Sequence, residues 1–185
     1  TQNEGFILFP LVVRSFGIFG SLVGVLTARM RSGEAPMGAL NRGFYITTGL
    51  NILFLAFCSY VMFGAGWLWF FLAGLVGIAN AVAFLFITLY YTQGGYRPVD
   101  TIAEASKTGP ATNIIAGLAV SLETTALPVL SISLALLASY YLGTRAIDAM
   151  GLSSTLHAAG GIYATAVATM GMLMSAAYIL AMDSF

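Results

Sequence analysis

Three ionisable residues, Arg14, Glu123 and Asp183, lie within or at the edge of long apolar runs. A charge inside a membrane-spanning helix is costly, so it often marks the path of an ion or proton. Asp183 differs from the other two because it ends a long uncharged run, where a carboxylate must be hydrated, paired or bound to a cation. For Arg14 and Glu123, a buried pair between them or snorkelling side chains is the structural alternative.

No complete catalytic constellation can be assembled from the remaining residues. His157 is the only histidine and Cys58 the only cysteine, so a zinc site and a disulfide both lack partners. The sequence contains neither a Walker-type phosphate loop nor a G-x-S-x-G nucleophile motif. We therefore expect no catalytic residue within this chain.

The composition indicates lipid as the surrounding solvent. The 185 residues are 59% hydrophobic and only 8% charged, whereas soluble domains carry roughly 25% charged residues. Seven basic residues balance seven acidic ones and form no basic run. Because nucleic-acid binding needs a basic patch, this composition excludes it.

Five apolar segments reach the length of about 20 residues that a helix needs to cross a bilayer. They cover residues 6–28, 44–63, 67–91, 111–142 and 160–183. None alternates with period two, which excludes barrel strands. The sequence therefore predicts an all-α integral membrane protein with five transmembrane helices. Residues 1–185 form a single membrane domain, and we expect both ends to be cut because apolar runs lie close to each terminus.

The basic residues orient these five segments. The loops 29–43 and 92–110 contain five of the seven basic residues. Because basic loops resist translocation, both should be cytoplasmic. The Thr1 end then lies outside, and Asp183 lies on the cytoplasmic side.

Two features inside the segments predict local structure. A short helix is expected in the second long loop, with Pro98 in its first turn. Pro128 predicts a bend in the fourth segment, because a proline has no N–H to donate to the carbonyl of Thr124. The hydroxyls of Thr124 and Thr125 could satisfy that carbonyl instead.

Small residues predict close helix packing. They recur in the first segment at Gly17, Gly20 and Gly24, and in the last at Gly160, Ala164, Ala168, Gly171 and Ser175. Such spacing lets helix backbones approach closely in lipid. The last segment should therefore be packed on several sides.

Three stretches resemble the membrane-integral pyrophosphatases, the ion pumps driven by pyrophosphate hydrolysis. The first is GGYRPVDTIAEASKTGPATNIIAGLAVSLETTALPV, residues 94–129. The others are AVATMGMLMSAAYILAMDSF, residues 166–185, and FPLVVRSFGIFGSLVG, residues 9–24. The resemblance runs in order along nearly the whole chain.

The resemblance implies a fragment of a larger pump. Its protomer would have about sixteen helices and form a homodimer, and the five helices here would be the seventh to the eleventh. The full-length enzyme would be an inorganic diphosphatase that couples pyrophosphate hydrolysis to translocation of H⁺ or Na⁺. Mg²⁺ would be bound mainly by residues outside this fragment, with K⁺ as a second candidate cofactor. The fragment alone is expected to be inactive.

One functional position is implied residue by residue. Asp183 matches an aspartate in the AMDSF-like block of the family, which would place it in the polar coupling funnel below the hydrolytic pocket. Metal ligation by Asp183 is the weaker alternative.

Two other classes of protein remain open from the residues themselves. A small secondary transporter would also combine a proline-broken helix with intramembrane charges, but it predicts inverted repeats that the sequence does not show. A structural membrane subunit would explain the few acidic residues, yet it leaves Arg14, Glu123 and Asp183 without roles.

Overall fold

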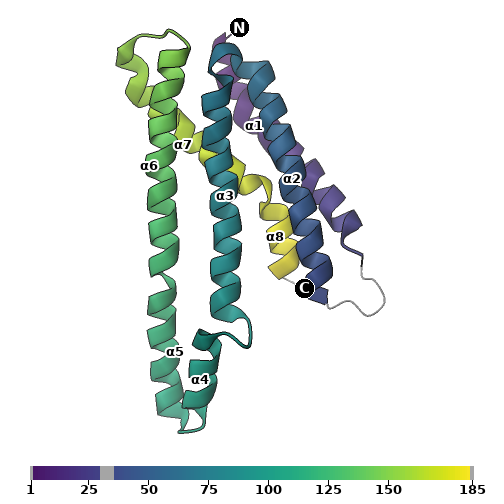
Figure 1. The fold of residues 1–185 in the computed structure, drawn as a ribbon, viewed down its shortest axis with the longest axis vertical. Coiled ribbons are helices and arrows are strands. Elements are labelled where there is room, and N and C mark those ends of the chain that lie inside the picture. Colours follow the sequence, from purple (N-terminus) through teal and green to yellow (C-terminus); the bar gives the residue numbers. More distant parts are fainter. Residues whose placement is uncertain (1, 30–35, 184–185) are drawn as a thin grey trace. The chain divides into compact units, whose positions relative to one another are not determined.

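The computed structural model describes residues 2–29 and 36–183, whose regular structure is entirely helical. The helices run in the order shown in Figure 1. They are α1 (Gln2–Thr27), α2 (Pro36–Phe63), α3 (Trp67–Thr92), α4 (Arg97–Ser106), α5 (Pro110–Thr124), α6 (Ala126–Ala149), α7 (His157–Met174) and α8 (Ala176–Asp183). Two short 3₁₀ turns, η1 (Gly64–Gly66) and η2 (Ser154–Leu156), precede α3 and α7. The all-α prediction is confirmed.

Four stretches of the described chain are long and apolar enough to cross a membrane. They are Gly5–Thr27, Gly38–Ser106, Pro110–Ala149 and Ser154–Met182. The second stretch contains both α2 and α3, which meet at η1. The short turn reverses the chain, so α3 runs back in the opposite direction to α2 (Figure 1).

The ends of the helices differ from the apolar segments of the sequence. Helix α2 begins at Pro36, well before the predicted start at Phe44, because a proline suits a first helical turn. The polar residues Asn41 and Arg42 are therefore helical, and Arg31 lies outside the described residues. Helix α4 confirms the predicted short helix, with Pro98 in its first turn.

The long fourth segment is interrupted near Pro128. Helix α5 ends at Thr124 and α6 begins at Ala126, so the break falls at Thr125. The expected role of the two hydroxyls is wrong. Thr124 donates to the carbonyl of Val120 and Thr125 to that of Leu122, each at 2.8 Å. Both hydroxyls therefore bond within the preceding turn, which is the nearest acceptor for a threonine in a helix.

The last segment contains a break that the sequence did not predict. Helix α7 ends at Met174, Ser175 adopts a turn, and α8 begins at Ala176. Neither proline nor glycine occupies the break itself. The predicted segment 160–183 falls almost wholly within the membrane-length stretch Ser154–Met182, and the sequence prediction lacked only the interruption at Ser175.

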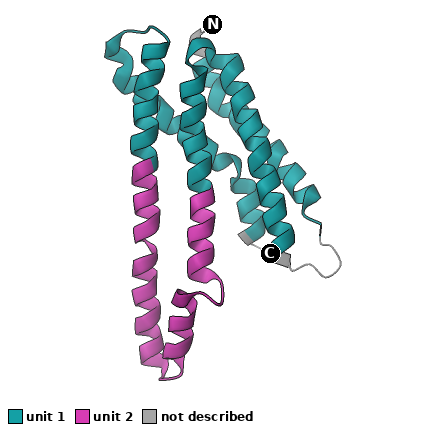
Figure 2. Cartoon of the chain, viewed as in Figure 1, with its two compact units in different colours: residues 1–81, 135–185 teal, residues 82–134 magenta. Residues whose placement is uncertain are grey.

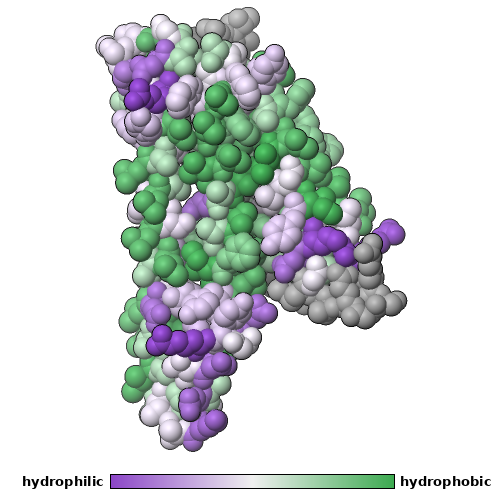
Figure 3. Space-filling model, viewed as in Figure 1, coloured by the Kyte–Doolittle hydropathy of each residue, from purple (hydrophilic) through white to green (hydrophobic). Residues whose placement is uncertain are grey.

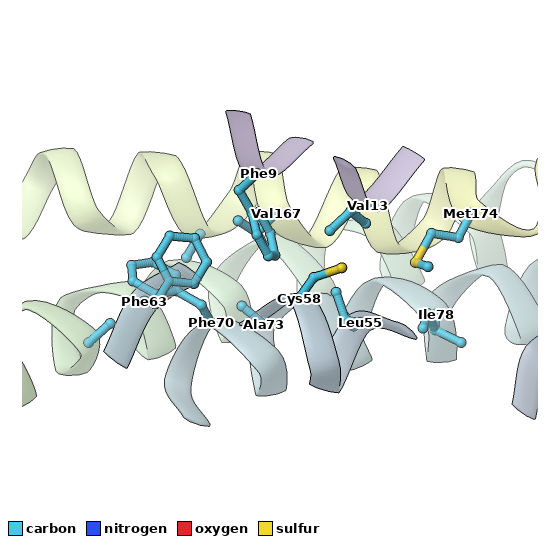
Figure 4. Packing of buried hydrophobic residues seen from close by; sticks show 12 residues of the cluster. Phe9, Val13, Leu55, Cys58, Phe63, Phe70, Ala73, Ile78, Val167 and Met174 are labelled. Atoms are coloured by element: carbon cyan, nitrogen blue, oxygen red, sulfur yellow. The ribbon is translucent and has the colours of Figure 1, made fainter. Parts of the chain in front are cut away.

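The chain divides into two compact units, coloured in Figure 2. Unit 1 consists of residues 1–81 and 135–185, and unit 2 of residues 82–134. Unit 1 has an apolar core to which α1, α2, α3, α6 and α7 all contribute. Figure 4 shows part of it, including Phe9, Cys58, Phe70 and Val167.

Small residues bring the helices of unit 1 into backbone contact, as predicted. A Cβ added at Gly77 of α3 would overlap the carbonyl oxygen of Ala168, and one at Gly171 would overlap that of Gly74. On another side of α7, a Cβ at Gly143 of α6 would overlap the carbonyl of Gly160. Helix α7 is thus enclosed by neighbours on several sides.

The outer surfaces of both units are strongly apolar. In unit 2, Ile114, Ile115 and Leu118 on α5 are 71%, 68% and 61% exposed, and no residue of α5 is buried. Hydrophobic residues cover much of the visible surface of unit 1, and hydrophilic residues gather around α4 and around the connection between α6 and α7 (Figure 3). Such apolar surface is stable only against lipid or other protein.

Candidate functional site

Arg14 is held at the end of α7. It lies on α1, partly buried, and its Nη1 donates to the carbonyl oxygen of Leu173. That carbonyl belongs to the last turn of α7, where helix carbonyls lack an intrahelical N–H partner. The backbone N–H of Ser175 is directed to the same oxygen. The charge found in the sequence therefore has a backbone partner at the break between α7 and α8.

Two further side chains converge on this break. Ser21 of α1 donates to the carbonyl of Met174 at 3.5 Å as well as to that of Gly17 at 3.0 Å. Asn51 of α2 donates through Nδ2 to the hydroxyl of Ser175 at 3.2 Å. We call Arg14, Ser21, Asn51 and Ser175 the break cluster.

The break cluster is shielded from solvent at its centre. Asn51 is 0% and Ser175 1% exposed. The Asn51 Oδ1 atom finds no hydrogen-bond partner among the described residues and faces Gly20, where an added Cβ would overlap it. Gly20 therefore provides the room for this amide, and a buried unpaired oxygen makes the site costly to maintain.

A reciprocal contact links α7 back to α1. Pro10 lies inside α1 and has no N–H to donate to the carbonyl of Phe6. The hydroxyl of Tyr163 on α7 donates to that carbonyl at 2.8 Å. Each of the two helices therefore satisfies backbone carbonyls that an irregularity leaves free in the other.

Helix α8 has its own anchor. The Tyr178 hydroxyl donates to the carbonyl of Leu40 on α2 at 2.7 Å, and the side chain is 2% exposed. A Cβ added at Gly43 would overlap this hydroxyl, so glycine is required beside it. Tyr178 thus ties the first turn of α8 to α2.

Glu123 has a partner of a different kind. It lies in the last turn of α5 in unit 2, and the hydroxyl of Tyr91 on α3 lies 3.5 Å from its Oε1. Arg14 belongs to unit 1. Each of these two charged residues therefore has a partner in its own unit, and a pair between them stays a prediction.

Asp183 is the last residue of α8, but its side chain lies outside the described part of the structure. His157 begins α7, and its Nε2 lies 2.7 Å from Oδ1 of Asp148 near the end of α6. This exposed contact joins the two helices across the connection that carries η2.

The described residues do not form a metal centre. Within the described ranges, no three His, Cys, Asp or Glu side chains lie together in a way that could hold an ion. Mg²⁺ prefers an octahedral set of oxygen ligands, which these residues do not fit. We derive no step through a metal from them.

The sequence analysis missed Ser21, Asn51, Ser175 and Tyr163 as partners at helix irregularities. Each is a polar or hydroxyl-bearing residue within an apolar run, which is the one signal that the sequence offered. Serine, asparagine and tyrosine occur in many membrane helices without such a role. The geometry of the break was needed to select them.

Long apolar helices that contact through glycines and satisfy one another's polar groups define a helical integral membrane protein. The chain belongs to the Inorganic H+ pyrophosphatase family, which it matches over residues 2–185. This membership confirms the resemblance found in the sequence.

Three relatives illustrate the match. The chain is 51% identical over 182 residues to the K(+)-insensitive pyrophosphate-energized proton pump 2 of Moorella thermoacetica, covering 97% of this chain and 25% of that protein. It is 46% identical over 196 residues to the Pyrophosphate-energized membrane proton pump 3 of Arabidopsis thaliana, covering 98% of this chain and 24% of that protein. It is 34% identical over 188 residues to the Pyrophosphate-energized proton pump 2 of Mycoplana dimorpha, covering 96% of this chain and 82% of that protein. The chain thus spans about a quarter of the length of the first two.

Proposed function

We propose that this chain is the central part of a membrane pump that hydrolyses pyrophosphate and uses the released free energy to move H⁺ across the membrane. The observation that carries the proposal is family membership over residues 2–185, with 51% identity to a relative named as a pyrophosphate-energized proton pump. The membership favours the pump over the small transporter and the structural subunit.

The proposed ion is H⁺ because the three relatives compared above are named as proton pumps. Na⁺ is the alternative ion. The relative at 51% identity is named K⁺-insensitive, so we expect hydrolysis without added K⁺. Mg²⁺ would be bound mainly by residues outside this chain, since phosphoryl transfer needs charge stabilisation by metal ions and no described cluster here fits one.

The proposed architecture has five membrane crossings. The stretch 38–106 counts as two, because it contains α2 of 28 residues and α3 of 26 residues, and each is long enough to span a bilayer. These five helices would be the seventh to eleventh of about sixteen in a homodimeric pump. The loops around residues 29–43 and 92–110 would face the cytoplasm, with the Thr1 end outside.

The proposed roles of the charged residues follow from their places. Asp183 would lie in the coupling funnel or, less directly, contribute to metal binding, because it is the only acid of α7 and α8 and ends α8. Arg14 and Glu123 would be intramembrane charges with partners on neighbouring helices.

Purified full-length protein in detergent tests the hydrolytic part. We expect phosphate release from pyrophosphate that requires Mg²⁺ and is the same in K⁺ and in choline buffers. Release that requires K⁺ would contradict K⁺ independence. No release from a folded full-length protein would contradict the proposed activity itself.

A further inference from the structure

We propose that Arg14 is a positioning residue, which fixes the direction of α8 by holding the break between α7 and α8. This inference rests on the proposed function, because α8 ends in Asp183. It adds a residue on α1 that acts on the coupling region through a backbone carbonyl rather than by touching an ion or substrate.

The first argument concerns the backbone groups at the break. A helix that stops within an apolar segment leaves the carbonyls of its last turn without their usual intrahelical donors, and neighbouring helices can supply donors instead. Arg14 and Ser21 of α1 donate to the carbonyls of Leu173 and Met174. Side chains of α1 therefore add donors at the break, beside the Ser175 N–H that is directed to the Leu173 oxygen.

The second argument concerns the type of the donor. Arg14 uses one nitrogen on one carbonyl here, rather than the two-pronged contact that arginine makes with carboxylates. A charge-assisted bond to a carbonyl is stronger than a neutral one. A lysine can supply one charged donor, whereas a methionine of similar length supplies none.

The third argument is geometric. Helix α8 has eight residues and is therefore about 12 Å long, so a change of about 15° at the break would displace its end by about 3 Å. A misplacement of about 1 Å in a functional group can reduce a rate by about 100-fold. The angle at the break is thus a sensitive determinant of where the end of α8 lies.

The remaining contacts make Arg14 the decisive member of the break cluster. Tyr178 anchors α8 to the carbonyl of Leu40, and Asn51 holds the Ser175 hydroxyl. Both of these bonds join the α8 region to α2. Arg14 provides the charged bond from α1 to the last turn of α7, so its loss leaves the neutral bond of Ser21 as the side-chain bond from α1 to the backbone at the break.

The test compares Arg14→Met, Arg14→Gln and Arg14→Lys in the full-length pump reconstituted in lipid vesicles. Arg145→Gln is the matched control, because that guanidinium donates to Tyr141 on its own helix, at 3.0 and 2.8 Å. Three quantities are measured for each variant: kcat and KM for Mg²⁺-pyrophosphate, H⁺ taken up per pyrophosphate, and hydrogen exchange of the α8 amides.

We expect Arg14→Met to lower kcat or H⁺ uptake at least about tenfold, with KM within about twofold, because the interaction supports the reaction rather than substrate binding. Arg14→Lys should recover most of this loss, and Arg14→Gln less. The α8 amides should exchange faster in Arg14→Met, while those of α4 should not change.

The inference would be overturned if Arg14→Met had the same activity and coupling as Arg145→Gln. A raised KM with unchanged kcat in Arg14→Met would overturn it as well. If Arg14→Met does not reach the membrane, the contrast between Arg14→Lys and Arg14→Gln decides. Equal behaviour of those two, or failure of all three variants to fold, would make Arg14 a general structural residue. An inactive wild-type pump with faster α8 exchange in Arg14→Met would contradict the proposed function and keep the positioning role.

Discussion

Arg14, Glu123 and Asp183 could be found from the sequence because a charge within an apolar run is conspicuous. The partners of Arg14 and Glu123 could not be found from the sequence. The partner of Arg14 is a backbone carbonyl at a helix break, and every residue has such a carbonyl. The partner of Glu123 is Tyr91, one of nine tyrosines in the chain. Hydrogen bonding in lipid is decided by geometry, which residue types alone do not specify.

Asp183→Asn provides the first prediction at the scale of the residue. The substitution removes the charge and preserves the shape of the only acid on α7 and α8. In the full-length pump, we expect ion transport to fall by about tenfold or more, with hydrolysis also reduced, since intramembrane acids are commonly parts of ion pathways. Ser184→Ala is the neighbouring control and should have little effect. Wild-type hydrolysis and pumping in Asp183→Asn would make this residue a structural end of the helix.

The bond between Tyr163 and the carbonyl of Phe6 gives a second prediction. Tyr163→Phe should destabilise the full-length protein by about 1–3 kcal/mol, the cost of an unsatisfied buried group. In a Pro10→Ala background the loss should be smaller, because an alanine at this position supplies the backbone N–H that proline lacks. Thermal inactivation of the wild type, the two single variants and the double variant measures this. Equal losses in both backgrounds would show that the hydroxyl does not compensate for the proline.

At the scale of the element, the sequence predicted the apolar helices, the short helix at Pro98 and the close packing of α7. Apolar length and small-residue spacing are local properties, which explains that success. The break at Thr125 was expected near Pro128, whereas the break at Ser175 was not. No local breaker is present at Ser175, and donors from α1 and α2 stabilise the interruption.

The contact between α3 and α7 predicts a strong effect at Gly77. A Cβ there would overlap the backbone carbonyl of Ala168, which cannot move aside as a flexible side chain can. Gly77→Ala should therefore destabilise the pump by about 1–3 kcal/mol, as overpacking does. Gly49→Ala on α2 is the control, because no described residue outside the adjacent backbone of α2 lies within 4 Å of the added Cβ. A thermal midpoint of Gly77→Ala equal to that of the wild type would contradict the close approach of α3 and α7.

The proposed orientation of the helices predicts which connections can be labelled from each side. In a Cys58→Ser background of the full-length protein, Ser106→Cys at the end of α4 should react with a membrane-impermeant thiol reagent only from the cytoplasmic side. Thr155→Cys in η2 should react only from outside. Labelling of Ser106→Cys in intact cells would mean that the orientation is reversed.

At the scale of the whole molecule, the family of the chain was recognisable from three stretches of sequence, and the match over residues 2–185 confirms it. The catalytic apparatus could not be derived, because the described carboxylates do not gather into a metal site. The chain, which spans about a quarter of the length of its first two relatives, shows how these helices pack and where their charges find partners. Under the proposed function, the residues that carry the chemistry would lie outside this chain.

The most direct test of the central claim is a simultaneous measurement of phosphate release and internal pH in vesicles that contain the full-length protein. Addition of Mg²⁺-pyrophosphate should release phosphate and acidify the interior, and a protonophore should abolish acidification while hydrolysis continues. The fragment of residues 1–185, reconstituted in the same way, should release no phosphate above a heat-treated control. Hydrolysis by the full-length protein that builds no ion gradient in the absence of the protonophore, or activity of the fragment alone, would contradict the claim that this chain is one part of a pyrophosphate-driven pump.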